Sequence, residues 1–246
     1  MATQKVAFIT GGNRGIGLET ARQLGKIAGI HVVIGSRDLA KGKAAADSLR
    51  ADGADVEAIR FDITKSADYK EAYDFFDKKF GKLDILINNA GIAKENFFGG
   101  NNTSKVSPAI LRETFDTNFF GTVELTQTLL PLIKEAPEGR IVNLSSILGS
   151  LTLHADPNSP IYNGKVLAYD ASKAALNVFT IHLAHELRNT KIKVNSAHPG
   201  WVKTDMGTEA APMEIPEGAK TSVALATLPA DGPTGAYIHL GKPLPW

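Results

Sequence analysis

The sequence predicts a single α/β domain over residues 1–246, in which a doubly wound parallel sheet of about seven strands lies between two layers of helices. One observation is that short apolar runs alternate with longer segments of helical periodicity along the whole chain. Such alternation is typical of parallel strands that are buried between helices. A second observation is that the chain of 246 residues contains neither a low-complexity linker nor an internal repeat.

Four apolar runs in the first half of the chain predict strands, because each run is short and is bounded by turn-forming or polar residues. These strands are expected at residues 5–10, 31–35, 56–61 and 83–88. The segments between them have helical periodicity: Ile16, Thr20 and Leu24, for example, fall on one stripe. Helices are expected at residues 15–27, 39–49 and 67–80.

The second half continues the alternation but contains three less regular segments. Glycines and asparagines at 99–102 predict a loop, residues 149–165 are expected to form an irregular excursion, and residues 204–216 a loop with room for a short helix. Helices are expected at residues 108–117, 119–134, 167–187 and 217–227. Strands are expected at residues 140–145, 192–198 and 236–240.

The composition excludes several classes of function. There are 27 basic and 26 acidic residues, for a net charge of +1, so bulk charge does not favour nucleic acid or another polyanion. The absence of cysteine excludes disulfides, thiolate metal sites and cysteine nucleophiles. No signal-peptide pattern and no apolar run of membrane-spanning length is present. We therefore expect a cytoplasmic protein without a metal site.

A glycine-rich turn, TGGNRGIG, follows the first predicted strand and precedes the first predicted helix. Gly11, Gly15 and Gly17 lack side chains, so the backbone there can turn tightly and approach a pyrophosphate, and the helix N-terminus offers amide donors to the anion. In a doubly wound, Rossmann-type sheet, ligands bind at the carboxyl ends of the strands, where the strand order switches direction. The turn therefore predicts a dinucleotide site.

The end of the second predicted strand indicates which dinucleotide is bound. An NAD site prefers a carboxylate at this position, to bind the ribose 2′-hydroxyl. Here Ser36 occupies the position and Arg37 follows it, while the glycine-rich turn contributes Arg14. Two guanidinium groups suit a 2′-phosphate, because each can bind it with two hydrogen bonds. The sequence favours NADP(H); the alternative is a solvated Arg37 followed by an Asp38 that merely caps the next helix.

Tyr169 and Lys173 form a candidate proton-donating pair. They lie four positions apart in a predicted helix, so their side chains share one face. A nearby ammonium would lower the pKa of the tyrosine from about 10 towards about 7, a change of roughly 3 units. The alternative is an ordinary packed tyrosine beside a solvated lysine.

Taken in order, these motifs resemble the short-chain dehydrogenase/reductase superfamily. The glycine-rich turn, the run from Asn88 to Gly91 and the Tyr169–Lys173 pair carry the resemblance. Further matches are Asp62, Asn118 in NFFG, the pair Ser145–Ser146, and Pro199–Gly200. Each motif is short, but the ordered set extends over essentially the whole chain.

The resemblance implies roles for four catalytic residues. Tyr169 is expected to be the catalytic acid/base, and Lys173 its pKa partner and a ligand of the nicotinamide ribose. Ser146, with Ser145 as second choice, is expected to donate a hydrogen bond to the substrate carbonyl, and Asn118 to hold a water of a proton relay. The implied cofactor-binding residues are Gly11, Asn13, Arg14, Gly15, Ile16, Gly17, Ser36, Arg37, Asp62, Ile63, Asn89, Ala90, Gly91, Tyr169, Lys173, Pro199, Gly200, Val202 and Thr204.

The chain departs from the family pattern in two places. The interval between Ser146 and Tyr169 is wide, so residues 149–165 are expected beside the substrate cleft. The C-terminal segment Gly241–Trp246 also differs. Both features resemble the carbonyl reductase branch, which includes monomers, and leave open whether this chain is a monomer or a homo-oligomer. The expected substrate pocket comprises Ser146, Leu148, His154, Tyr162, Trp201 and Met206, with Phe97 and Phe98 as further apolar candidates.

The resemblance implies an NADPH-dependent oxidoreductase, a carbonyl reductase or ketoreductase that converts an apolar or aromatic ketone or aldehyde to an alcohol. One alternative is a 3-oxoacyl-(acyl-carrier-protein) reductase, which needs a basic docking patch for its acidic carrier. Another is a non-catalytic NADPH-sensing regulator; the presence of all four expected catalytic residues counts against it. His182 and His185 lie one helical turn apart, a spacing that a metal site could use, but without a carboxylate or third ligand they are expected to be surface or interface residues.

Overall fold

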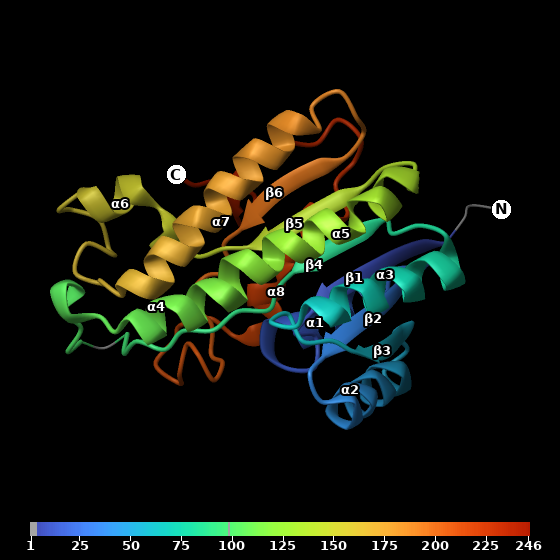
Figure 1. Cartoon of the computed structure of the whole chain (residues 1–246), viewed down its shortest axis with the longest axis horizontal. Coiled ribbons are helices and arrows are strands. Elements are labelled where there is room, and N and C mark those ends of the chain that lie inside the picture. Colours follow the sequence, from blue (N-terminus) through green and yellow to red (C-terminus); the bar gives the residue numbers. More distant parts are fainter. Residues whose placement is uncertain (1–3, 98) are drawn as a thin grey trace.

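All the strands in the computed structural model, which describes residues 4–97 and 99–246, belong to one sheet (Figure 1). Its order is β3-β2-β1-β4-β5-β6-β7-β8; neighbours are parallel except for the antiparallel pair β7–β8. The strands are β1 (Lys5–Thr10), β2 (Ile30–Ser36), β3 (Val56–Arg60), β4 (Ile85–Asn88), β5 (Arg140–Leu144), β6 (Lys193–Ala197), β7 (Tyr237–His239) and β8 (Lys242–Pro243). The predicted fold class is confirmed, with β8 as an addition.

Helices cover both faces of the sheet. They are α1 (Gly15–Gly25), α2 (Leu39–Ala51), α3 (Ser66–Phe80), α4 (Pro108–Phe115), α5 (Gly121–Glu135), α6 (Leu151–Ala155), α7 (Leu167–Glu186) and α8 (Ile215–Ala226). Apolar side chains of α3, α5 and α7 pack on one face, and those of α1, α2 and α8 on the other. None of the helices in the described part of the chain combines the length and apolarity needed to cross a membrane.

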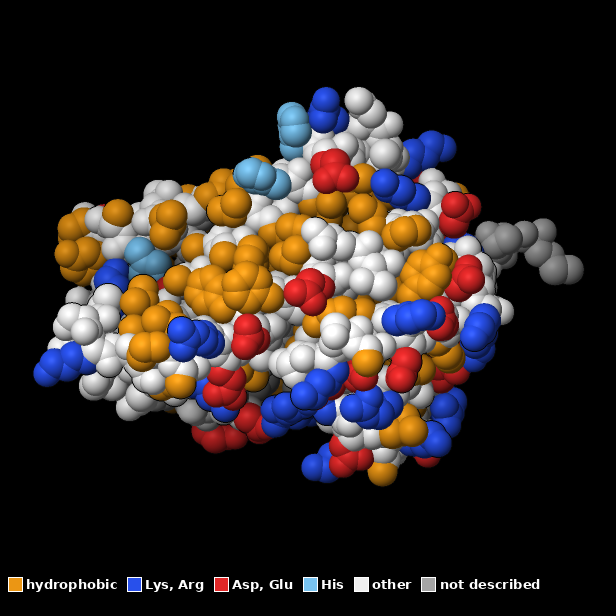
Figure 2. Space-filling model, viewed as in Figure 1, with side chains coloured by type: hydrophobic (Ala, Val, Ile, Leu, Met, Phe, Trp, Pro, Cys, Tyr) orange, Lys and Arg blue, Asp and Glu red, His pale blue; other side chains and the backbone are white. Residues whose placement is uncertain are grey.

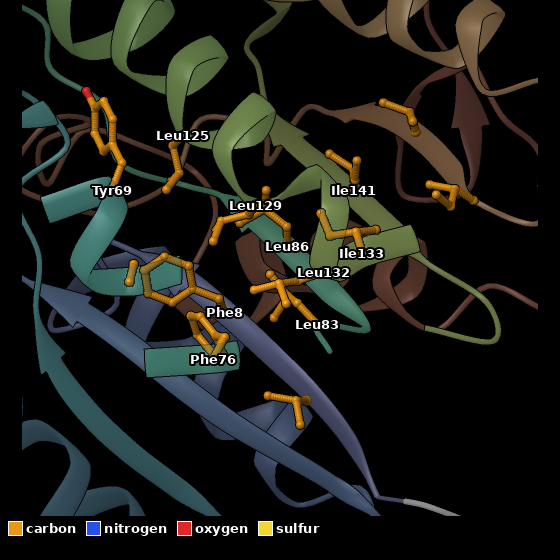
Figure 3. Close-up of a cluster of buried hydrophobic side chains, with 14 of the residues drawn as sticks. Phe8, Tyr69, Phe76, Leu83, Leu86, Leu125, Leu129, Leu132, Ile133 and Ile141 are labelled. Atoms are coloured by element: carbon orange, nitrogen blue, oxygen red, sulfur yellow. The ribbon is translucent and has the colours of Figure 1, made fainter. Parts of the chain in front are cut away.

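The alternation of side chains along β1 shows why its sequence forms a central strand. Val6 and Phe8 point into the cluster beneath α3, α5 and α7, where Phe8 packs against Phe76 (Figure 3). Ala7 and Ile9 point into the opposite cluster. Both clusters are fully buried at this strand, and each large apolar side chain buried there contributes about 1.5–3 kcal/mol.

The sequence-based boundaries hold to within one or two residues for most elements, but the structure corrects three segments. The helices expected at 108–117 and 119–134 are not separate: the π-helical turn η2 (Asp116–Phe120) joins α4 to α5. The excursion at 149–165 contains the short helix α6. Residues 204–214 form turns without a helix, α8 begins at Ile215, and Val202 and Met213 form an isolated bridge.

Apolar side chains reach the surface on the face built by α4, α5 and α7 (Figure 2). Phe120 is 50% exposed, and Val178 and Ile181 of α7 are 52% and 38% exposed. The helix that carries Tyr169 therefore presents one apolar side to solvent in the isolated chain.

The order of the strands fixes where a ligand can bind. β1 lies between β2 and β4, so the chain leaves β1 towards one edge of the sheet and later returns to build the other half. The loops after β1 and β4 diverge at this switch, and in sheets of this kind the crevice between them binds ligands. The glycine-rich turn and Asn89 lie at this crevice.

Candidate active site

The glycine-rich turn has the geometry that an anion requires. Gly11 and Gly15 adopt φ values of +63° and +55°, a left-handed conformation that strongly favours glycine. Arg14, at the N-cap position of α1, makes no side-chain hydrogen bond to the first helical turn. The amide groups of that turn are therefore available to a phosphate at the helix N-terminus.

Asn89 joins the glycine-rich turn to the end of β4. Its Nδ2 donates hydrogen bonds to the carbonyls of Thr10 (2.8 Å) and Gly11 (3.2 Å). The Thr10 hydroxyl in turn accepts from the backbone N–H groups of Asn89 and Ala90, each at 3.0 Å. A methyl group on Gly17 would lie 2.4 Å from Asn89 Nδ2, so this close approach requires glycine. The Asn89 side chain thus fixes the floor of the crevice.

The end of β2 carries the residues expected to select the dinucleotide. The Ser36 hydroxyl is buried and donates to the Asp38 carbonyl at 2.8 Å. Asp38 caps α2 by accepting from the backbone N–H groups of Ala40 and Lys41, so its carboxylate is committed to the helix. Arg37 is exposed. Asp38 therefore caps α2, as the alternative prediction stated, and the Arg37 side chain lies exposed at the surface.

Arg14 pairs with Asp205, which lies in the segment after β6. Its Nη1 lies 2.5 Å from Asp205 Oδ2, and the two side chains are 67% and 82% exposed. An ion pair this exposed contributes about 0–1 kcal/mol, so a 2′-phosphate can compete for the guanidinium. Thr204, next to Asp205, faces the glycine-rich turn: its Cγ2 is 3.7 Å from the position that a Gly15 Cβ would occupy.

The turn after β3 is held by its own hydrogen bonds. Asp62 Oδ1 accepts from the backbone N–H and the hydroxyl of Thr64, at 3.0 and 2.9 Å. The Ile63 carbonyl accepts from the Tyr69 hydroxyl at 2.6 Å. The position of Asp62 and Ile63, which we expect to contact adenine, is thus set by short-range contacts.

The structure brings the four expected catalytic residues together. Tyr169 and Lys173 lie on α7, Ser146 follows β5, and Asn118 lies in the π-helical turn η2. All are buried, with exposed fractions of 7%, 4%, 9% and 1% respectively. Lys173 Nζ donates to the Leu144 carbonyl at 2.7 Å and lies 5.6 Å from the centroid of the Tyr169 ring.

The pKa of Tyr169 does not move in the direction expected from the sequence. Burial raises it to about 12, the Asp170 carboxylate adds to the rise, and a hydrogen bond with Ser146 opposes it. Burial lowers the pKa of Lys173 to about 8. The prediction that Lys173 lowers the pKa of Tyr169 towards neutrality is wrong for this arrangement, because desolvation dominates and the ammonium binds the Leu144 carbonyl. Tyr169 therefore keeps its proton at neutral pH, as a proton donor must.

The side chain of Asn118 ties the segment after β4 to α7. Its Oδ1 accepts from the Ile92 N–H at 2.8 Å, and its Nδ2 donates to the Ile92 carbonyl at 2.9 Å and to the Ser172 hydroxyl at 3.0 Å. The side-chain amide is thus engaged by the protein, and the expected water contact remains a prediction. Ser145 is more deeply buried than Ser146, at 2% against 9%, which favours Ser146 for contact with substrate.

The residues expected to line a substrate pocket fall into two groups. In the first, His154 Nε2 contacts the Leu148 carbonyl at 2.9 Å and Nδ1 contacts Lys165 Nζ at 3.1 Å, so both ring nitrogens are engaged. Tyr162 is exposed, and Lys165 Nζ lies 5.0 Å from the centroid of its ring. In the second group, Trp201 Nε1 donates to the Gly207 carbonyl at 2.7 Å, and Met206 is 37% exposed. Phe98 lies outside the described residues.

Two further residues near the site carry no signal in the sequence. Glu95 Oε2 accepts a hydrogen bond from the Tyr169 backbone N–H at 3.0 Å. His198 Nδ1 accepts from the backbone N–H of Ile147, the residue after Ser146, at 3.2 Å, and its ring packs at a tilt of 41° against His239, with 4.7 Å between centroids. Burial lowers the pKa of His198 to about 3, so the ring is a neutral acceptor. No local pattern predicts contacts over 74 and 51 residues.

Comparison with known proteins identifies relatives of the whole chain. The family model for short chain dehydrogenases matches residues 5–215. Human carbonyl reductase [NADPH] 1 is 34% identical over 280 aligned positions, which cover 98% of each chain. Among solved structures, an NADPH-bound carbonyl reductase from chicken fatty liver superimposes with a TM-score of 0.84 at 29% identity over 100% of both chains. Salutaridine reductase from Papaver somniferum gives a TM-score of 0.81 at 30% identity, covering 95% of this chain and 99% of its own.

Proposed function

The chain belongs to the short-chain dehydrogenase family, and from this membership we propose that it is an NADPH-dependent carbonyl reductase in which Tyr169 donates the proton. The observation that carries the proposal is that Tyr169, Lys173, Ser146 and Asn118 converge beside the crevice at the carboxyl end of β1, where the glycine-rich turn follows the strand. The substrate that we propose is an apolar or aromatic ketone or aldehyde, because Phe97, Trp201 and Met206 supply apolar surface near this crevice.

The residues around the crevice fit NADP(H). The left-handed Gly11 and Gly15 and the first turn of α1 would hold the pyrophosphate. Arg37 and Arg14 would bind the 2′-phosphate, which would compete with Asp205 for the Arg14 guanidinium, while the Asp38 carboxylate at the end of β2 is committed to capping α2. Lys173 would bind the nicotinamide ribose. When bound, the reduced cofactor supplies a hydride to the substrate carbonyl carbon.

Tyr169 and Ser146 act on the charge that then grows on the carbonyl oxygen. Both hydroxyls are donors in a buried setting, where hydrogen bonds to a developing oxyanion are strongest. Because the pKa of Tyr169 lies near 12, the hydroxyl is protonated before reaction and transfers its proton only as the alkoxide forms. Lys173, whose ammonium binds the Leu144 carbonyl, would hold the nicotinamide ribose beside Tyr169, and Asn118 would hold the route by which the proton is replaced.

The first test is the loss of absorbance of the reduced nicotinamide, with NADPH and NADH assayed side by side on an aryl ketone, an aliphatic keto ester, an aldehyde and an acetoacetyl thioester. We expect turnover of the apolar carbonyls with NADPH. Turnover of the thioester alone would favour a 3-oxoacyl reductase. NADPH binding without any turnover would favour a sensor. Equal use of NADH would contradict the role of Arg37.

The second test is the Tyr169→Phe variant, which removes only the phenolic hydroxyl. General acid catalysis contributes about 10²–10⁴-fold, so kcat should fall by that factor while the Kd for NADPH stays close to that of the wild type. Tyr73→Phe, on α3, is the matched control. Near-normal reductase activity in Tyr169→Phe would refute the mechanism.

A further inference from the structure

Two carboxylates from different parts of the chain cap the first turn of α7, the helix that carries Tyr169. Val166, at the N-cap position, makes no side-chain cap, and its backbone N–H donates to Asp170 Oδ2 at 3.0 Å. The Tyr169 backbone N–H donates to Glu95 Oε2, also at 3.0 Å. The N–H groups of a first turn have no partner inside the helix, and negative charge is favourable beside them. Glu95 thus completes the helix from a segment 74 residues away.

The segment that carries Glu95 also contacts the Tyr169 ring. Phe97 packs edge-on against it, with 5.4 Å between centroids and 84° between ring planes. Edge-to-face contact of this kind is a favourable aromatic geometry and restricts both rings. Residues 95–97 therefore hold Tyr169 at two points, its backbone N–H and its side chain.

Phe97 is at the same time a wall of a hollow beside the site. The hollow has a volume of about 220 Å³, and Gly99, Gly100, Asn101, Asn163 and Lys165 complete its lining. The hollow therefore lies between the Glu95 segment and the excursion that precedes α7. A displacement of residues 95–97 would change the hollow and the setting of Tyr169 together.

We propose that Glu95 is a positioning residue, whose hydrogen bond to the Tyr169 backbone holds Phe97 and the first turn of α7 in the arrangement that directs the Tyr169 hydroxyl at the substrate carbonyl. The inference rests on the proposed role of Tyr169 as proton donor. A donor must lie about 2.6–3.2 Å from the atom it protonates. Glu95 itself touches neither the hydroxyl nor the carbonyl, and it acts through the position of the helix turn.

The charged groups around this turn give the inference a second observable. Three charged or titratable groups face Asp170 on α7. They are Glu95, Lys165 from the preceding loop, and His154 of α6, whose Nε2 lies 3.4 Å from Asp170 Oδ2. The negative charge of Glu95 is one of the causes that raise the pKa of Asp170. Removing that charge should therefore lower the pKa of the Asp170 carboxyl, whether or not the enzyme turns over.

The experiment compares Glu95→Ala, Glu95→Gln and the control Glu113→Ala in the full-length protein. Glu113 forms an exposed ion pair with Lys94, 2.7 Å apart, and so contacts the same segment through Lys94. In Glu95→Ala, kcat for an apolar ketone should fall by roughly 10- to 100-fold, since a misplaced catalytic group can cost about 10²-fold. The Kd for NADPH should not change. Glu95→Gln keeps an acceptor oxygen and should retain most of kcat, and Glu113→Ala should match the wild type.

Amide NMR of Tyr169 measures the hydrogen bond directly. Its N–H resonance should move, and its hydrogen exchange should accelerate, in Glu95→Ala but not in Glu113→Ala. A Tyr169 resonance unchanged in Glu95→Ala overturns the inference, as does a normal kcat after the bond is lost or an equal loss of kcat in the Gln and Ala variants. If Glu95→Ala does not fold, the kcat, the Tyr169 N–H resonance and the pKa of Asp170 in Glu95→Gln decide the inference. A wild-type protein inactive on every carbonyl would refute the proposed function and this inference with it, whereas an active wild type with a normal Glu95→Ala refutes the inference alone.

Discussion

The cofactor side and the substrate side of the site are built in different ways. On the cofactor side, the loops after β1, β2 and β3 are shaped by glycine conformations and by bonds between residues close in sequence, such as Ser36 to Asp38 and Asp62 to Thr64. On the substrate side, Glu95 reaches Tyr169 over 74 residues and His198 reaches Ile147 over 51. The turns on the cofactor side are thus shaped largely by glycines and short-range bonds, with Asn89 as a long-range support, whereas the substrate side depends on single long-range side-chain bonds.

The difference has a physical consequence for mutation. A loop whose shape depends on the absence of a side chain fails when any side chain is added, because the nearest atoms are backbone or are themselves bonded. A loop held by one side-chain hydrogen bond can be restored by another acceptor placed at the same point. Substitutions on the two sides should therefore differ in size and in whether a conservative replacement rescues them.

The largest effect is expected from Gly17→Ala on the cofactor side. The added methyl would lie 2.4 Å from Asn89 Nδ2 and 2.6 Å from the Gly11 carbonyl, so the glycine-rich turn must shift. We expect affinity for NADPH, measured by fluorescence titration, to fall at least about 100-fold, with a loss of stability of about 1–3 kcal/mol from overpacking. Gly164→Ala is the control, because the added methyl would lie 3.5 Å from the Ile161 carbonyl oxygen and 3.8 Å from Leu148 Cδ2, which is ordinary contact distance. An unchanged Kd in Gly17→Ala would contradict a cofactor side whose shape depends on the absence of a side chain at this turn.

A smaller and rescuable effect is expected from His198→Ala on the substrate side. The variant leaves the Ile147 N–H without its acceptor next to Ser146, which costs about 1–3 kcal/mol if the group stays buried. Displacement of Ser146 should weaken binding of the transition state. We expect kcat/KM for the carbonyl substrate to fall about tenfold for each 1.4 kcal/mol of transition-state stabilisation lost, with little change in the Kd for NADPH. His198→Asn, whose Oδ1 can replace Nδ1, should recover most of the loss, and the exposed His185→Ala should have no effect. Failure of the asparagine to rescue would mean that ring packing on His239 matters more than the hydrogen bond.

The smallest effect concerns Asp170 and the pH dependence of stability. Burial, with a contribution from Glu95, raises the pKa of Asp170 from 3.8 to about 7. The folded protein therefore binds this proton more tightly than the unfolded chain, so its contribution to stability is complete below pH 3.8 and is lost as the pH rises through about 7. We expect Asp170→Asn to reduce the fall in Tm between pH 5.5 and pH 8, measured by thermal unfolding. The exposed Asp156→Asn serves as control, and an identical pH profile in Asp170→Asn would refute the assignment.

The sequence predicted most of the sheet because each inner strand is a short apolar run, as in KVAFIT at β1. It also predicted that the four catalytic residues belong together, because their motifs stand in a familiar order. It could not predict the pKa of Tyr169, since spacing along a helix establishes proximity to Lys173 but not the degree of burial that raises the value. Glu95 and His198 were missed for the same reason: an isolated charged or aromatic residue in a loop carries no local record of a partner far along the chain.

The π-helical turn η2 has a consequence for the angular phase of the helices that it joins. Its Gly121 N–H bonds the Asp116 carbonyl, a span of five residues where an α-helix uses four. Since each α-helical residue advances the side-chain direction by about 100°, the turn resets the azimuth of α4 relative to α5. Deleting one residue from Asp116–Phe120 would therefore preserve a regular helix but rotate Asn118 off the face that meets Ile92 and Ser172. The irregular turn is what keeps these three residues in register.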